Sequence, residues 1–146
     1  MQLIPPILVL ILLVVMIALR VVAPGPVVVS YPYSLAGALL ATLGLLVTGA
    51  GARLFARVGT NIKTFNEPGV LVTGGLFRWS RNPMYLGFVL LLAGTAILLG
   101  AATPFLAVVL FALIADRWYI AFEERALERK FGEDYAAYMR GTRRWI

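Results

Sequence analysis

Long runs of uncharged apolar residues alternate with short polar stretches along the chain. The first run begins at Leu3 and ends before Arg20, and about 20 apolar residues are enough for one membrane-spanning helix. It lacks the basic start and small-residue cleavage site of a signal peptide, so we expect it to remain in the mature chain. Three prolines between residues 23 and 32 then exclude a continuous helix. The pattern predicts two spans, at about 3–22 and 33–51.

The third uncharged run is too long for a single span. It extends from Met84 to Ala115 and has 32 residues. As one helix it would be about 48 Å long, whereas the hydrocarbon core of a bilayer is about 30 Å thick. The sequence Gly-Ala-Ala-Thr-Pro at residues 100–104 is the expected break, because glycine ends helices and proline begins them. We therefore predict a tight hairpin of two spans, at about 83–99 and 104–119.

The second span carries small residues at spacings that bring them onto one face of a helix. Such residues let two helices approach closely inside a membrane. We interpret this pattern as helix packing rather than as a ligand site. The residues concerned are Gly37, Ala41, Gly44 and Thr48.

After the fourth span, residues 121–140 predict an amphipathic helix. Its apolar positions are Phe122, Leu127, Phe131, Tyr135 and Tyr138. The last four residues, Arg-Arg-Trp-Ile, are typical of an anchor at the lipid headgroups. The predicted fold class is an all-α integral membrane protein with four transmembrane helices, the last two forming a tight helical hairpin, followed by this C-terminal amphipathic helix. Residues 1–146 form a single membrane domain, with polar segments at 52–82 and 120–146.

Composition and charge agree with a membrane protein and predict its orientation. Hydrophobic residues make up 61% of the sequence and charged residues 14%, against about 45–50% and about 25% in soluble domains. Of the 13 basic residues, only Arg20 falls on the far side of the predicted spans, and all 7 acidic residues lie with the other basic ones. By the positive-inside rule, the polar segments and both termini are cytoplasmic. We expect a multi-pass protein of a bacterial or archaeal cell membrane, with the bilayer rather than nucleic acid as its partner.

The sequence contains no histidine and no cysteine. Their absence excludes disulfides, thiolate nucleophiles, histidine-ligated haem, the usual zinc and copper sites and every catalytic triad that uses imidazole. No metal site is predicted. Any chemistry must rest on the carboxylates, arginines, tyrosines and amides of the two polar segments.

A first polar cluster, Arg-Asn-Pro-Met-Tyr-Leu-Gly at residues 81–87, lies at the entry to the third span. Asn82 is suited to cap a helix and Pro83 to occupy its first turn, so the cluster is typical of an ordinary helix start. The alternative is a ligand site, because the amides of a helix N-terminus beside Arg81 can bind a carboxylate or a phosphate. The residues alone leave both interpretations open.

A second polar cluster follows the last span. In a helix, Asp116, Tyr119 and Glu123 fall on one stripe. Acidic residues near the membrane that face a helix bundle are costly and suggest function. Glu124, by contrast, is typical of a solvated face shared with the arginines and glutamates that follow it.

Taken together, these segments resemble a known family. They are VLVTGGLFRWSRNPMYLG at residues 70–87, the helical hairpin, the pair Glu123-Glu124, and FGEDYAAY at residues 131–138. In this order they are similar to the isoprenylcysteine carboxyl methyltransferase and phospholipid methyltransferase superfamily, whose members are integral membrane enzymes that use S-adenosylmethionine. The resemblance covers about residues 69–138. It implies transfer of a methyl group to a hydrophobic acceptor in the membrane, either a carboxylate or a lipid amine.

Carried over by position, the resemblance implies a cofactor site built from three segments. The Gly-Val-Leu-Val sequence at residues 69–72 and Phe77 line the adenosine and methionine portions of S-adenosylmethionine. Residues 82–85 match the family's His-Pro-x-Tyr element, and Glu123 matches the glutamate that holds the cofactor. The implied cofactor-binding residues are Gly69, Val70, Leu71, Val72, Phe77, Asn82, Pro83, Met84, Tyr85 and Glu123. The implied catalytic residues are Glu123, Tyr85 and Arg81.

Two positions depart from the eukaryotic pattern of this superfamily. Asn82 stands where the family usually has a histidine, which keeps a hydrogen-bonding contact but excludes an imidazole base. Tyr119 stands where the prenylcysteine enzymes have a substrate arginine, and Arg117 lies two residues away. We therefore expect Arg117 and Tyr119 to be the substrate-binding residues.

Methyl transfer suits a chain without histidine or cysteine, because the donor is already activated and the protein mainly aligns the reactants. A carboxylate acceptor needs no base, whereas an amine acceptor does, and the candidates are Glu123, Glu124 and Asp116. One alternative is an NADPH-dependent sterol-type membrane reductase; those sequences carry Asn-Tyr-x-Gly followed by an acidic residue, where this chain has Phe88 after Gly87. The other is a non-enzymatic membrane scaffold.

Overall fold

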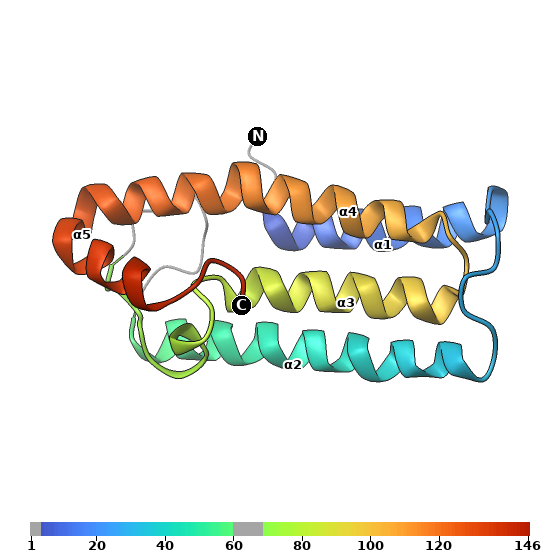
Figure 1. Cartoon of the computed structure of the whole chain (residues 1–146), viewed down its shortest axis with the longest axis horizontal. Helices are drawn as coiled ribbons and strands as arrows, with labels where there is room; N and C mark the ends of the chain where they lie inside the picture. Colours follow the sequence, from blue (N-terminus) through green and yellow to red (C-terminus); the bar gives the residue numbers. More distant parts are fainter. Residues whose placement is uncertain (1–3, 60–68) are drawn as a thin grey trace.

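The computed structural model describes residues 4–59 and 69–146. Within them, four long helical passes lie side by side, and each runs antiparallel to the one before it along the chain (Figure 1). The α-helices are α1 (Pro5–Val22), α2 (Ala36–Arg57), α3 (Pro83–Leu99), α4 (Pro104–Ile114) and α5 (Ala121–Gly141). Two single 3-10 turns, η1 (Tyr33–Leu35) and η2 (Gly75–Arg78), precede α2 and α3, and a π-helical turn, η3 (Ala115–Ile120), joins α4 to α5. The start of α1 and the end of the chain lie toward the same end of the bundle (Figure 1).

The helices are apolar enough for a membrane protein. Three continuous helices, Pro5–Val22, Tyr33–Arg57 and Pro104–Gly141, are long and apolar enough to cross a bilayer, and α3 is an apolar helix of 17 residues. No named β-strand occurs in the two described stretches of chain. The predicted all-helical class is therefore confirmed, with three helices that meet the length and composition of a span and a shorter fourth.

The closest helix packing is between α2 and α3, and it depends on glycine. A Cβ added to Gly44 would lie 2.5 Å from the carbonyl oxygen of Gly87, and one added to Gly94 would lie 2.6 Å from the carbonyl oxygen of Gly37. Thr48 Oγ1 also donates a hydrogen bond to the carbonyl of Met84 at 3.2 Å. The small-residue face predicted for the second span is thus confirmed, because larger side chains would force the two backbones apart.

The hydrophobic core lies where α1 packs on α3 and α4. Met16 of α1, Leu92 of α3 and Phe111 of α4 are fully buried in one cluster. The cluster continues into η3 through Ala115 and Tyr119. Packing of the core therefore fixes the position of η3 along the bundle and its rotation, and η3 carries Asp116 and Tyr119 of the second polar cluster.

The predicted break between the third and fourth spans is confirmed. Helix α3 ends at Leu99, and Gly100 caps it with a φ of 71°, a left-handed conformation that favours glycine. Helix α4 then begins at Pro104. The 23–32 loop is bound to this turn by backbone hydrogen bonds, among them Val28 N to the carbonyl of Gly100 at 2.8 Å.

Two helix boundaries differ from those expected. Helix α2 continues past residue 51 to Arg57, because the sequence ARLFAR has good helix formers and no glycine or proline. The last pass does not end at 119 but continues through η3 into α5, since residues 105–131 contain no helix-breaking residue. Gly132, with φ 49° and ψ −118°, makes the first real interruption and turns the end of α5 back toward the bundle (Figure 1).

Candidate functional site

The two polar clusters of the sequence meet at one end of the bundle. The start of α3 lies beside η3 and the first turns of α5, and the end of the chain returns to the same place (Figure 1). Residues 38 and 43 positions apart in sequence are joined there by direct side-chain hydrogen bonds, Tyr85 to Glu123 and Arg81 to Glu124. We refer to this end, formed by residues 80–85, 116–124 and 142–146, as the site end.

Tyr85 and Glu123 form a side-chain pair at the centre of the site end. The hydroxyl of Tyr85 donates to Glu123 Oε1 at 2.8 Å. The Tyr85 ring stacks on the ring of Tyr119, with centroids 6.1 Å apart, and both rings are buried. The arrangement places a carboxylate, a phenol and two aromatic faces together, and these groups suit a cationic ligand or one with hydroxyls.

Arg81 connects the start of α3 to α5 and to the end of the chain. Its Nη2 pairs with Glu124 Oε1 at 2.9 Å, and its Nη1 donates to the carbonyl of Thr142 at 2.7 Å. Both partners of the ion pair are largely buried, with side-chain exposures of 13% and 12%. The Nε–H of Arg81 is buried and has no hydrogen-bond partner among the described residues. A buried donor of this kind is costly unless a ligand supplies the acceptor.

Arg144 joins two acidic residues that lie two turns apart on the continuous helix. Its guanidinium pairs with both oxygens of Glu124 and, at 3.2 Å, with Asp116 Oδ1. The indole N–H of Trp145 donates to the same Asp116 oxygen at 3.0 Å. The hydrogen bond to Glu124 raises the pKa of Arg144 above its ordinary value. We call Arg81, Asp116, Glu124 and Arg144 the ion network.

The cap expected at the start of α3 is only half correct. Pro83 occupies the first turn of α3 as predicted, but the Asn82 side chain makes no cap hydrogen bond. Its Nδ2 instead donates to the carbonyl of Arg144 at 3.0 Å, while its backbone N–H donates to the Ser80 hydroxyl at 3.0 Å. Asn82 is therefore part of the contact between α3 and the end of the chain.

Phe77 and residues 69–72 lie beside the site end, where the chain approaches α3. The Phe77 ring is buried and stacks on Phe55 of α2 with centroids 5.0 Å apart, and its carbonyl accepts from the Tyr138 hydroxyl at 2.6 Å. Burial raises the pKa of Tyr138 to about 12. Leu71 and Val72 are half-buried, whereas Val70 is 49% exposed. The sequence Glu67-Pro68-Gly69 is a turn signal that falls mostly outside the described residues.

Arg117 and Tyr119, both expected to bind substrate, lie in different surroundings. Tyr119 is buried against Tyr85. Arg117 is 83% exposed, contacts Asp116 Oδ2 at 3.4 Å, and lines an open groove of about 620 Å³ along α4, η3 and α5. The remaining groove residues are Leu113, Ile114, Trp118, Phe122 and Arg125. The structure thus brings Tyr119, but not Arg117, to the Tyr85–Glu123 pair.

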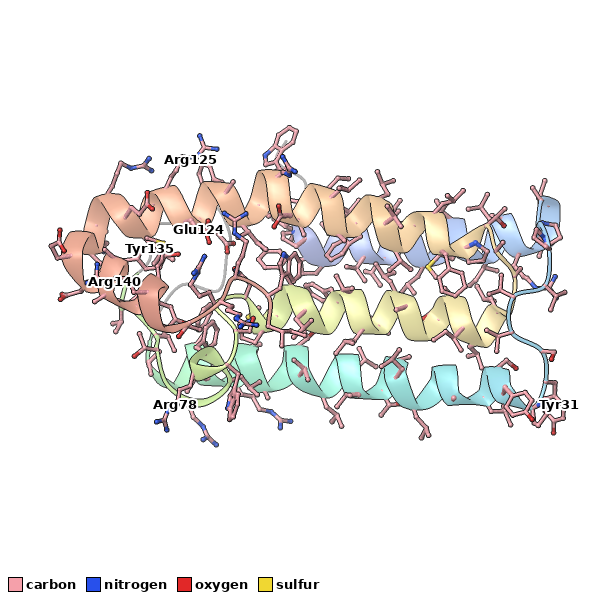
Figure 2. The ribbon with its side chains drawn as sticks, in the orientation of Figure 1. Tyr31, Arg78, Glu124, Arg125, Tyr135 and Arg140 are labelled. Carbon is pink, nitrogen blue, oxygen red and sulfur yellow. The ribbon has the colours of Figure 1, made fainter. Side chains whose placement is uncertain are left out.

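Two interpretations of charged residues from the sequence were wrong. Glu124 is not on a solvated face: it points toward the bundle while Arg125 points away (Figure 2). Arg144 and Trp145 are not free headgroup anchors, since both bind Asp116. The signal that could have revealed this was the cost of Asp116 and Glu124 near the membrane, which requires cationic partners. Arg144, in the polar segment 120–146, was one basic residue that could serve as this partner.

Comparison with known proteins assigns the family. The profile of the family described as Phospholipid methyltransferase matches residues 33–134. This match covers more than half of the chain, includes α3, α4 and most of the site end, and agrees with the resemblance seen in the sequence. The chain belongs to the phospholipid methyltransferase family, and with its apolar helices it is a multi-pass membrane protein.

Three curated proteins are similar to the chain. An uncharacterized protein of Haemophilus influenzae is 40% identical over 63 residues, which is 43% of this chain and 100% of that protein. The protein-S-isoprenylcysteine O-methyltransferases of Schizosaccharomyces pombe and Saccharomyces cerevisiae are 36% and 34% identical, over 50% and 74% of this chain. The chain spans 31% and 49% of the lengths of these two yeast proteins. No solved structure matches.

Proposed function

We propose that the protein transfers a methyl group from S-adenosylmethionine to a hydrophobic acceptor that partitions into the membrane, with a carboxylate or a lipid amine as the methylated group. The observation that carries this proposal is the partly buried Tyr85–Glu123 pair, together with the Arg81 Nε–H, a buried donor without a hydrogen-bond partner in the described part of the chain. The chain that carries them belongs to the phospholipid methyltransferase family. The methyltransferase names of the two yeast relatives support the reaction class.

The polar groups of the site end fit the charges of S-adenosylmethionine. Its sulfonium and ammonium are cations, which suit the Glu123 carboxylate and the Tyr85 and Tyr119 ring faces. Its carboxylate is an acceptor that suits the Arg81 Nε–H. Residues 69–72 and 82–85, with Phe77, would complete the cofactor site in the arrangement implied by the sequence resemblance.

The protein's own groups have a limited chemical task in this reaction. When bound, S-adenosylmethionine supplies an activated methyl group, so no metal or covalent nucleophile is required from the chain. Tyr85 and Tyr119 exclude water, because both rings are buried. Glu123 and Arg81 orient a ligand from two sides, and orientation of this kind is a major part of catalysis by alignment.

Glu123, Glu124 and Asp116 are the candidate proton acceptors if the methylated group is an amine. Asp116 and Glu124 each form ion pairs with arginine side chains of the ion network. Glu123 accepts a hydrogen bond from the Tyr85 hydroxyl and so lies next to the two buried rings. A carboxylate acceptor would need no base, and Glu123 would then only bind and orient.

The charge distribution supports four spans with the site end in the cytoplasm. The ion network lies at the site end, and α5, which carries many of the other charged residues, begins there. Arg20 lies at the opposite end and donates to the carbonyl of Leu99 at 2.9 Å. This arrangement places the site where a water-soluble cofactor arrives from the cytoplasm and a hydrophobic acceptor arrives from the bilayer. We infer that both termini are cytoplasmic in a bacterial or archaeal cell membrane.

Isothermal titration calorimetry on the detergent-purified chain tests the proposal. S-adenosylmethionine is expected to bind, and Glu123→Gln and Tyr85→Phe are each expected to weaken its affinity by about tenfold or more. The matched controls are Glu133→Gln and Tyr31→Phe, which change exposed residues (Tyr31 in Figure 2). Unchanged affinity in both site variants would refute the site. Binding of NADPH but not of S-adenosylmethionine would indicate the reductase, and binding of neither would indicate a scaffold.

A further inference from the structure

Segment 142–146 binds the start of α3 through its backbone. The carbonyl of Thr142 accepts from Arg81 Nη1 at 2.7 Å, and the carbonyl of Arg143 accepts from the Arg81 backbone N–H at 2.9 Å. The segment therefore accepts hydrogen bonds from two Arg81 N–H groups, whereas the buried Nε–H has no acceptor within residues 4–59 and 69–146. The contacts of this segment therefore decide which N–H group of Arg81 lacks an acceptor and could donate to a ligand.

The side chain of Arg144 controls the remaining partner of Arg81. Glu124 Oε1 accepts from Arg81 Nη2 at 2.9 Å and from Arg144 Nε at 3.2 Å, while Glu124 Oε2 pairs with Arg144 Nη2. Both oxygens of Glu124 are therefore bound by Arg144 in a forked contact. Only one of them also reaches Arg81.

Removal of Arg144 would release one oxygen of Glu124. A carboxylate readily binds an arginine side-on, through Nε and one Nη, because the two N–H groups match its two oxygens. A released Glu124 could then bind Arg81 in this way and occupy the Nε–H. Arg144 prevents this by keeping Glu124 turned toward itself.

We propose that Arg144 is a positioning residue that reserves the Nε–H of Arg81 for the carboxylate of the ligand. This inference rests on the proposed function and deepens it, since it names the residue that makes the site selective for the carboxylate-bearing form of the cofactor. Arg144 acts here through Glu124 and Arg81 and does not itself touch the ligand.

The experiment compares two ligands that differ only in this carboxylate. Calorimetry on the full chain measures Kd for S-adenosylmethionine and for its decarboxylated analogue, which keeps the sulfonium, the amine and the adenosine. The wild type is expected to prefer S-adenosylmethionine. Arg144→Gln is expected to raise the Kd for S-adenosylmethionine by about tenfold and to change the Kd for the analogue by less than about twofold. Arg140→Gln, which removes an exposed charge from the end of α5 (Figure 2), is the matched control.

A milder variant guards against loss of folding. Arg144→Lys keeps the positive charge but lacks the fork that holds both Glu124 oxygens, so it is expected to lose part of the preference in the same direction. An equal increase in Kd for both ligands in these variants would mean that Arg144 only supports the fold, and would overturn the inference. An unchanged preference for S-adenosylmethionine over the analogue would overturn it as well. A wild type that binds both ligands equally would overturn the inference alone. A wild type that binds neither would overturn the proposed function as well.

Discussion

The two ends of the helix bundle are held together by different kinds of contact. At the end formed by the 23–32 loop and the 100–103 turn, backbone amides and carbonyls join the two segments, as in Ala102 N to the carbonyl of Pro26 at 3.0 Å. At the site end, the ion network and the Tyr85–Glu123 pair join segments through side chains. One end depends on backbone shape and the other on the identity of each side chain.

Because of this difference, substitutions at the two ends should affect stability and ligand binding differently. Backbone contacts tolerate most substitutions except at positions where the conformation requires glycine, such as Gly100. In a partly buried ion network, loss of one member leaves a charge without compensation, and that residual charge is more costly than the pair was favourable. The site end therefore carries more polar groups than stability requires, which is typical of a binding site.

The largest effect is expected when Arg81 is removed from the site end. Arg81→Met should lower the free energy of unfolding by about 3 kcal/mol, because Glu124 keeps only Arg144 as a cationic partner and the side-chain hydrogen bond to the carbonyl of Thr142 is lost. It should also abolish measurable binding of S-adenosylmethionine. Denaturant unfolding in detergent and calorimetry measure the two effects, with the exposed Arg78→Met as control (Figure 2). Lost stability with intact binding would contradict the role of Arg81 in the site.

A smaller effect, on stability alone, is expected at the opposite end. Gly100→Ala should lower the free energy of unfolding by about 1–2 kcal/mol, because alanine is strained at a φ of 71° and its Cβ would meet the carbonyl of Val29. Binding of S-adenosylmethionine per folded molecule should not change. A substantial loss of affinity in the folded variant would show that the two ends are not independent.

The smallest effect is a change in how stability depends on pH. Burial raises the pKa of Tyr138 from 10.0 to about 12, so the folded state holds this proton where the unfolded state has lost it. The associated stability is complete below about pH 10 and is lost as pH rises toward about 12. Tyr138→Phe should flatten the decrease in stability between these pH values, measured by unfolding at a series of pH values. Tyr31→Phe, at the opposite end, should leave the slope unchanged, and an equal slope in Tyr138→Phe would contradict the assignment.

Much of the fold could be predicted from the sequence because it depends on local signals. The bounds of α3 and the start of α4 follow from Pro83, Gly100 and Pro104, which have strong preferences for helix starts and ends. The close approach of α2 and α3 follows from the spacing of small residues. Continuity from α4 into α5 was missed, because a change from apolar to charged residues was read as a new element although nothing in that stretch interrupts a helix.

The site could be predicted only in part. The Tyr85–Glu123 contact agrees with the two motifs of the sequence resemblance, although neither motif gives a distance. The contacts of Arg144 and Trp145 were missed because they depend on the reversal at Gly132, which brings the end of the chain back to Asp116. A pairing between residues 28 positions apart across a change of direction leaves no periodic pattern in the sequence.

The π-helical turn η3 sets the rotation of α5 relative to α4 within one continuous helix. Before Ala115, this helix packs against the apolar core through Phe111. After Ile120, its Glu123 and Glu124 bind Tyr85 and Arg81. Deleting one residue within η3 would turn everything beyond it by roughly 100°. The apolar part of the helix would keep its packing, while both glutamates would move away from Tyr85 and Arg81. The rotation set by this one turn therefore decides whether the apolar half of the molecule and its charged half form one site.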